Sequence, residues 1–366
     1  MNTTKRRFSE GLRIVWAIAA KDVVDALRNK ITISIIIGVA FLMLSGQALS
    51  LLLKLQSTPS VVVYDAGKSD LVAELKKSDD LRLRTMPSQQ ELQESVGGAA
   101  GPLLGLTIPA NFDQALEAGG LFELDGYFVH WVNPADAAET QTFFEDKLTE
   151  LAGQSVRINT EGHAVYPSPD AGGQPSMVSR SLVIAVLTIC GAIVPFLMIE
   201  EKETHTLDAL LVSPASIGQV VTGKALAGVF YGLTAAGVVF AFNQALVVHW
   251  GVALLAAVCG SLFAVAVGLL LGSLFDNPAS MNLWFGGLLL ALLMPVFLVN
   301  TLGSNVPQIV RTILPWIPTV LLSQVVHISF TASVPLDRVL LNLGIVVGSA
   351  VAVLAAVVWV VRRSDR

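Results

Sequence analysis

Charged side chains are scarce in this sequence of 366 residues, because only 14% are Asp, Glu, Lys or Arg while 53% are hydrophobic. A soluble globular domain carries roughly 25% charged residues, so the composition argues against a soluble protein and predicts a membrane protein. Cysteine is almost absent as well. Cys190 and Cys259 are the only two, and both lie in apolar runs, so we predict buried thiols and no disulfide framework.

Motifs that carry out catalysis or hold metals are missing too. The sequence has no G-x-S-x-G and no H-E-x-x-H, and its five histidines form no pair at metal-ligand spacing on one helix. The string GQVVTGKA, residues 218–225, follows the phosphate-loop pattern as far as Lys224 but ends in Ala225, which lacks the Mg²⁺-binding hydroxyl. We therefore expect no catalytic residue, cofactor or metal in this chain, and we expect Lys224 to extend toward lipid headgroups at the end of a span.

Long apolar runs are what the sequence has in abundance. Six of them are long enough, at roughly 17 to 25 residues, to cross about 30 Å of hydrocarbon. They lie near residues 31–53, 180–199, 219–248, 251–275, 281–302 and 337–361. The first run is about twice as long as the apolar part of a signal peptide and has no small-residue cleavage site, so we interpret it as an uncleaved anchor.

Basic residues flank the first and the last span. They are Lys5, Arg6, Arg7, Arg13, Lys21, Arg28 and Lys30 before the first span, and Arg362, Arg363 and Arg366 after the last. By the positive-inside rule, both termini are predicted to be cytoplasmic, which places residues 54–178 and 303–336 outside and residues 200–218 inside. The charge agrees with this arrangement, since residues 54–178 contain 18 acidic and 8 basic residues and the rest contains 10 and 15.

The long outer segment alternates strand-like and helix-like stretches. Strands are predicted near 61–65, 81–86, 103–109 and 124–132, and helices near 70–78, 88–96 and 110–119. This alternation predicts an α/β domain. Asn133 and Pro134 are typical of the N-cap and first residue of a further helix, and the Pro/Gly/Ser-rich residues 166–176 predict a linker back to the membrane.

The segment before the first span is predicted to be an amphipathic helix. Its apolar stripe at helical spacing consists of Leu12, Val15, Trp16, Ala19, Val23, Ala26 and Leu27. Charged residues such as Arg13, Lys21 and Arg28 lie on other faces. Such a helix fits the membrane interface, because a helix fully solvated by the cytoplasm, which is the alternative, would leave the stripe and Trp16 unused.

Residues 200–216, EEKETHTLDALLVSPAS, form a charged and amphipathic gap between the second and third spans. Thr204 or Thr206 is suited to cap a short helix that Ser213 and Pro214 end. The apolar face of this helix consists of Leu207, Leu210 and Leu211. We predict a docking helix for a basic groove on a soluble partner. A connector lying on lipid headgroups is the alternative, but anionic headgroups would repel its glutamates.

The same stretch carries a family resemblance. The string E-E-K-E-x-x-T-L-D-A-L-L-V-S-P, residues 200–214, resembles the coupling region of type-2 ABC exporter permeases. Residues 19–32, AAKDVVDALRNKIT, are similar to the amphipathic segment before the first span of these permeases, and residues 106–116, LTIPANFDQAL, are similar to a stretch in the outer domain of the sodium-efflux and drug-efflux subgroup. Residues 312–330 are similar to the re-entrant outer helices of such permeases. With the six spans, the resemblance covers essentially the whole chain.

The fold implied is an α-helical polytopic membrane protein with six transmembrane helices, an N-terminal amphipathic interface helix and an α/β extracytoplasmic domain between spans one and two. Its parts are the interface helix 1–30, the first transmembrane helix 31–53, the α/β domain 54–178, and the five-helix region 179–366 with its coupling helix 200–216 and outer re-entrant segment 303–336. The resemblance places it as a multi-pass protein in the plasma (inner) membrane of a bacterium or archaeon.

The function implied is that of a permease subunit in an ATP-driven exporter. A separate cytoplasmic ATPase subunit would bind ATP and Mg²⁺, and a second permease chain would complete a homodimer or a heterodimer. Membrane lipid is an expected partner, and nucleic acid is not. The expected ATPase-coupling residues are Glu200, Glu201, Lys202, Glu203, Thr206, Leu207, Leu210, Leu211, Ser213 and Pro214; the interface helix contributes Trp16, Lys21, Asp22 and Arg28; and the re-entrant segment contributes Pro315, Trp316 and Pro318. Glu201 and Glu203 would orient the contact or pair with Arg28.

Two other classes of function stay open at this point. An ATP-independent membrane scaffold or receptor with a ligand-binding outer domain would need no ATPase partner. A secondary transporter is disfavoured, because proton- or ion-coupled transport uses ionisable groups at the bilayer midplane and the deep polar residues here, such as Thr234, Asn243 and Gln244, are not ionisable. The cargo is equally open among lipophilic drugs, peptides, lipids and sodium.

Overall fold

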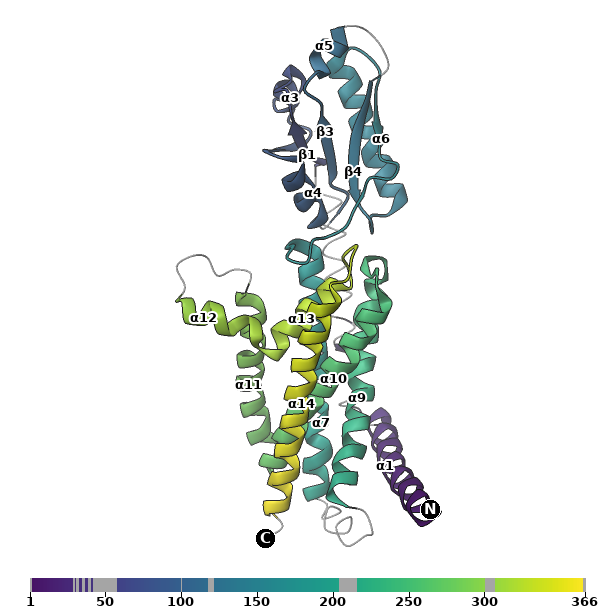
Figure 1. Ribbon diagram of the computed structural model, residues 1–366, viewed down its shortest axis with the longest axis vertical. Helices are drawn as coiled ribbons and strands as arrows, with labels where there is room; N and C mark the ends of the chain where they lie inside the picture. The colour runs from purple at the N-terminus through teal and green to yellow at the C-terminus, as the bar shows by residue number, and fades with distance from the viewer. Residues whose placement is uncertain are drawn as a thin grey trace. The chain divides into compact units, whose positions relative to one another are not determined.

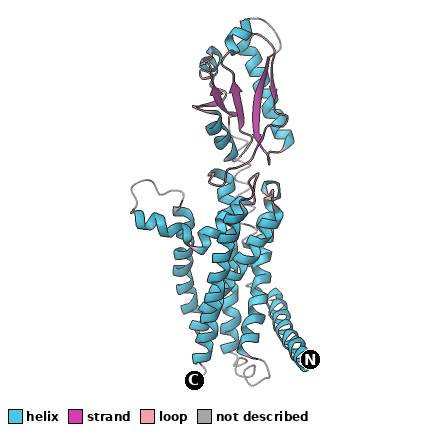
Figure 2. Cartoon of the chain, viewed as in Figure 1, coloured by secondary structure: helices cyan, strands magenta, loops and turns pink. Residues whose placement is uncertain are grey.

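The structure of the protein, a computed structural model, describes residues 2–28, 30, 33–34, 37–38, 41, 58–99, 101–117, 122–203, 216–299 and 307–364. These residues form two compact units. One unit consists of the N-terminal helix and the long apolar helices, and the other consists of a sheet with its own helices (Figure 1, Figure 2).

Among the described residues, six strands form the sheet of the α/β unit. They are β1 (Ser60–Asp65), β2 (Arg82–Met86), β3 (Leu104–Ile108), β4 (Phe122–Val129), β5 (Val156–Asn159) and β6 (Ala164–Val165). The strand order is β2-β1-β3-β4-β5, with β6 beside β4. β1 runs parallel to β2 and β3, whereas β3 and β4 are antiparallel. The central strands β1 and β3 are nearly continuous apolar runs because both of their faces are covered.

Helices cover the two faces of this sheet (Figure 1). They are α3 (Asp70–Leu75), α4 (Gln89–Gly97), α5 (Phe112–Glu117) and α6 (Pro134–Ala152). Phe144 and Leu148 of α6 are buried in the core on one face, and Leu92 of α4 is buried in a second core on the other. The predicted start of α6 is confirmed, since the Asn133 side chain accepts a hydrogen bond from the backbone N–H of Ala135 at 3.0 Å.

The sequence analysis predicted no strand in the stretch that holds β5 and β6. These strands are short, with four and two residues, and a run of this length carries little periodic signal. That the α/β unit lies outside the membrane stays a prediction.

Five helices among the described residues are long and apolar enough to cross a membrane. They are α7 (Gly173–Glu203), α9 (Ile217–Phe242), α10 (Trp250–Leu274), α11 (Pro278–Leu298) and α14 (Leu336–Ser364). These helices correspond to the second through the sixth predicted span. The first predicted span, 31–53, lies largely outside the described residues.

The predicted third span, 219–248, is wrong at its end. α9 stops at Phe242, where the Asn243 side-chain amide donates a hydrogen bond to the backbone carbonyl one turn earlier, at 2.8 Å. A short 3₁₀ turn, η1 (Gln244–Leu246), follows. Asn243 and Gln244 therefore lie in a turn at the end of the span, whereas the sequence analysis placed them deep inside it. The side-chain amide of Asn243 ends the helix by binding its backbone.

α7 and α10 form the interior of the helical unit. In their most apolar windows, 72% of α7 and 67% of α10 is buried, against 17% of α11 and 22% of α14. Glycines allow the two inner helices to approach closely. A Cβ atom on Gly268 would lie 3.0 Å from the carbonyl oxygen of Cys190, and one on Gly272 would lie 2.8 Å from the carbonyl oxygen of Pro195. Small residues at such contacts are typical of helices packed within a membrane, where α11 and α14 keep apolar sides for lipid.

A bent helical pair lies between α11 and α14 in the chain. It consists of α12 (Gln308–Ile313), the 3₁₀ turn η2 (Leu314–Trp316) and α13 (Pro318–Ile328). The two arms meet at 66°, a geometry that suits either a broken span or a re-entrant loop. Pro315 lies in the first turn of η2, before the bend, and Pro318 is the first residue of α13, after it. A residue without a backbone N–H is tolerated at both positions. Trp316 between them is exposed. The outer location of this segment stays a prediction.

Candidate functional site

The N-terminal helix α1 (Asn2–Arg28) packs along α9 (Figure 1). Its buried residues in this contact, Val15, Ala19 and Asp22, recur at i, i+4 and i+7 and so lie on one face. Gly223 of α9 makes the close approach possible, because a Cβ atom there would lie only 2.8 Å from the Ile18 side chain. The chain thus brings its beginning against the first turns of a helix about two hundred residues later.

An ion pair is buried in this contact. The Lys224 ammonium of α9 lies 3.6 Å from the Asp22 carboxylate of α1, with the lysine side chain fully buried and the aspartate side chain 5% exposed. The same ammonium donates a hydrogen bond to the backbone carbonyl of Leu197 in α7, at 2.8 Å. The Lys224 side chain therefore links its own helix, α9, to both α1 and α7.

The expectation that Lys224 extends to the lipid headgroups is wrong. Its side chain is 0% exposed. A buried ammonium is tolerated only when it is paired and hydrogen-bonded, and the protein supplies both a carboxylate and a carbonyl oxygen for it. The phosphate-loop likeness of this stretch is therefore unrelated to phosphate binding, since the lysine ammonium binds Asp22 of α1 and the Leu197 carbonyl of α7.

A tyrosine completes the cluster. The Tyr231 hydroxyl donates a hydrogen bond to the backbone carbonyl oxygen of Asp22, at 2.8 Å, and the tyrosine is itself buried. We refer to Asp22, Leu197, Lys224 and Tyr231 as the three-helix joint. Two residues of α9, seven positions apart on one face, thus hold the same residue of α1 by its side chain and by its backbone.

The predicted residues of the interface helix fall on different sides of α1. Asp22 belongs to the three-helix joint, whereas Trp16, Lys21 and Arg28 are exposed. Trp16 is 72% exposed, so the predicted apolar stripe is divided between a part that packs on α9 and a part, with Leu12, that does not. An exposed tryptophan beside exposed leucine suits a helix that also touches the lipid interface.

The predicted coupling segment is described only at its two borders. α7 continues through Glu200, Glu201, Lys202 and Glu203, which the sequence analysis placed after the span, although their side chains lie outside the described residues. Thr206, Leu207, Leu210, Leu211, Ser213 and Pro214 lie outside the described residues altogether, as does the proposed pairing of the glutamates with Arg28.

Both borders of this segment are close in sequence to the three-helix joint. Leu197 lies in the last two turns of α7, before the segment begins, and Lys224 lies two turns into α9, after it ends. α9 itself starts at a capping box, in which Ser216 and Gln219 bind each other's backbone N–H groups. Sequence reasoning named Asp22 and Lys224 separately and did not pair them. The signal that could have suggested the pair is that Asp22 and Lys224 are opposite charges, each beside apolar residues, in a sequence with few charged residues.

The joint is suited to holding helices together and not to chemistry. Its carboxylate, ammonium and hydroxyl groups are all engaged within the protein. Across the part of the chain that the structure describes, no three His, Cys, Asp or Glu side chains are grouped so that they could hold a metal ion.

Comparison with protein families gives one match. A family described as "ABC-2 family transporter protein" matches residues 30–359, which is most of the chain; the match begins after α1 and ends within α14. No curated protein matches the chain.

Proposed function

The chain belongs to the ABC-2 family of transporter proteins, and from this premise we propose that it is the permease subunit of an ATP-driven exporter that works with a separate ATPase subunit. As a family member with several apolar helices it is a multi-pass membrane protein of an ABC transporter. Export as the direction, cytoplasmic termini, pairing with a second permease chain and membership of the sodium-efflux and drug-efflux subgroup belong to the proposal.

The observation that carries the coupling part of this proposal is the three-helix joint. An ATPase that closes on ATP would push on residues 200–214 and on α1. Lys224 contacts Asp22 of α1 and the Leu197 carbonyl of α7, so a displacement of α1 is passed directly to the helix that leads into residues 200–214. Breaking a buried ion pair costs several kcal/mol, so the pair of Lys224 and Asp22 would keep the two helices together when one of them is pushed.

The remaining roles follow the residue pattern. Leu207, Leu210 and Leu211 would insert into a cleft of the ATPase, and the glutamates at the end of α7 would orient that contact. Binding can shift the permease between conformations only if these contacts differ between the two states. The α/β unit would lie on the far side of the membrane, where it gates the exit or holds a partner.

The proposal is tested by purifying the full chain in mild detergent and identifying the proteins that accompany it. Leu210→Asp places a charge on the predicted apolar face, and Ala209→Asp places the same charge on the opposite face as a matched control. We expect an ATPase subunit with active turnover to accompany the wild type and Ala209→Asp, but not Leu210→Asp.

Absence of an ATPase from all three preparations, under conditions that keep other transporter complexes intact, would contradict the proposal and favour the ATP-independent scaffold or receptor. If an ATPase accompanies all three, the partner is right but residues 200–214 do not hold it.

A further inference from the structure

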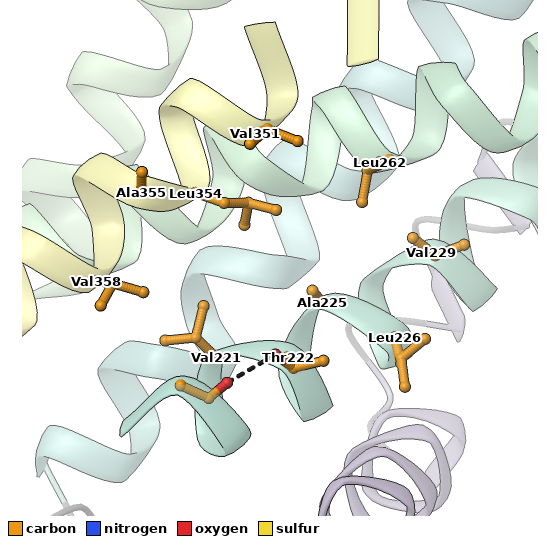
Figure 3. A pocket seen from close by; sticks show the side chains of 11 residues that line it. Val221, Thr222, Ala225, Leu226, Val229, Leu262, Val351, Leu354, Ala355 and Val358 are labelled. Carbon is orange, nitrogen blue, oxygen red and sulfur yellow. Dashed lines mark hydrogen bonds between the residues drawn. The ribbon is translucent and has the colours of Figure 1, made fainter. Parts of the chain in front are cut away.

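An apolar groove lies between α9 and α14 at the end of the helical unit where α9 begins and α14 ends (Figure 3). Its volume is about 400 Å³. The side chains around it include Val221 and Val229 of α9, Leu262 of α10, and Val351, Ala355 and Val358 of α14 (Figure 3). Thr222 is the one polar side chain among the described lining residues, and its hydroxyl donates a hydrogen bond to the Gly218 carbonyl oxygen at 2.7 Å. Among the described residues, the lining is therefore almost entirely apolar.

The length of the groove matches one leaflet of a bilayer. Its lining on α9 extends from Gly218, where the apolar span starts, to Val229, which at 1.5 Å per residue is about 16 Å. Half of a hydrocarbon core about 30 Å thick is about 15 Å. The groove is therefore long enough along α9 to hold most of a single acyl chain of the leaflet on this side.

A positive charge stands at the headgroup end. Arg362 is exposed and follows Val358 by four residues and Val351 by eleven, so it lies on the same face of α14 that lines the groove, one turn beyond it. Arg363 is also exposed, but it lies on another face, where its guanidinium is 5.4 Å from the ring of Trp359. Of these two arginines, Arg362 is therefore the one placed at the open end of the groove.

We propose that this groove binds one anionic phospholipid, whose acyl chain lies between α9 and α14 and whose phosphate binds Arg362. Apolar burial alone would not select a lipid, because acyl chains are as apolar as the leucine side chains around them. Selection comes from the headgroup, since one arginine near an anionic lipid favours it over a neutral one by about fivefold. The inference depends on membrane insertion and does not depend on an ATPase partner or on the direction of transport.

Native mass spectrometry of the full chain tests this. The protein is released from nanodiscs made of equal parts dioleoylphosphatidylcholine and dioleoylphosphatidylglycerol, and the lipids that stay bound are counted. Ala355→Phe fills the groove, and Ala352→Phe makes the same change at an exposed position of α14 outside its lining. Arg362→Gln removes the charge at the open end, and Arg363→Gln removes the neighbouring charge.

We expect the wild type to retain one phosphatidylglycerol, Ala355→Phe to retain none, and Arg362→Gln to lose the preference for phosphatidylglycerol by about fivefold, while both controls behave as the wild type. Retention in Ala355→Phe equal to that of the wild type would overturn the proposal. So would equal losses in Arg362→Gln and Arg363→Gln, since that is a diffuse effect of surface charge. Ala355→Phe could instead convert a dimer of the chain to a monomer without changing the amount of bound lipid. A second copy of the chain would then cover the groove, which would also overturn the proposal.

Discussion

Removing the charge of Lys224 tests whether the three-helix joint holds α1. Lys224→Met replaces the lysine with an uncharged side chain of similar length, so the Asp22 carboxylate stays buried without the ammonium that pairs with it. Breaking a buried ion pair in this way costs about 3–5 kcal/mol. Asp22→Asn breaks the pair from the other side and is expected to cost a similar amount. In the double variant both charges are gone, and most of the loss should be recovered, because a neutral pair carries no uncompensated charge.

Hydrogen exchange of the full chain in detergent measures this loss locally. The backbone amides of α1 exchange when the helix leaves α9, since most helical stability in proteins comes from packing. A loss of about 3–5 kcal/mol raises the open population by roughly two to four powers of ten, and the exchange of α1 accelerates accordingly. Amides in α10, which lies in the interior of the unit, serve as the internal reference for global unfolding.

Asp25→Asn is the matched control, because Asp25 is an exposed aspartate one turn after Asp22 on the same helix. It should change exchange by no more than a surface substitution does, about 0.5 kcal/mol or twofold. The reasoning is refuted if the single variants leave the exchange of α1 unchanged, or if the double variant is as fast as the faster single variant. In the second case the side chains would matter for their shape and not for their opposite charges.

Three further predictions concern the same helices. Gly223→Val should displace α1, because a Cβ atom there already meets Ile18, and should cost about 1–3 kcal/mol in the exchange measurement. Gly237→Val has open space around it and should cost nothing, since valine has a slightly higher helix propensity than glycine. Tyr231→Phe removes the hydrogen bond to the α1 carbonyl and should cost about 1 kcal/mol, seen as roughly fivefold faster exchange in α1 with α10 unchanged. Gly272→Leu should lower the midpoint of thermal unfolding by forcing α7 from α10, whereas Gly286→Leu on α11 should not; equal midpoints for these two variants would contradict the close packing.

The sequence predicted elements well where the signal was local. Asn133 and Pro134 marked the start of α6 because a cap and its helix are neighbours in sequence. The apolar composition and the length of each run were sufficient to predict the five apolar helices. The end of α9 was misjudged because an amide that ends a helix looks the same in sequence as an amide buried within it.

The three-helix joint was not predictable by these means. Nothing local pairs Asp22 with Lys224, and a lysine near the start of an apolar run is usually interpreted as a residue that reaches the headgroups. Its burial follows from the packing of α1 on α9, which a single sequence does not reveal. The same is true of the α9/α14 groove, since its lining comes from three helices and only their packing brings the side chains together.

The contact between Tyr231 and Asp22 spans 209 positions of the chain, and this separation sets an order in time. A ribosome adds about 5–20 residues per second, so α1 exists for roughly 10–40 s before the residues that bury its aspartate have been made. Until then the Lys224 ammonium and the Tyr231 hydroxyl do not exist, so α1 cannot make the contacts of the three-helix joint. α1 is thus synthesised well before the helix that holds it, and a nascent chain stopped before Lys224 should leave α1 open to protease.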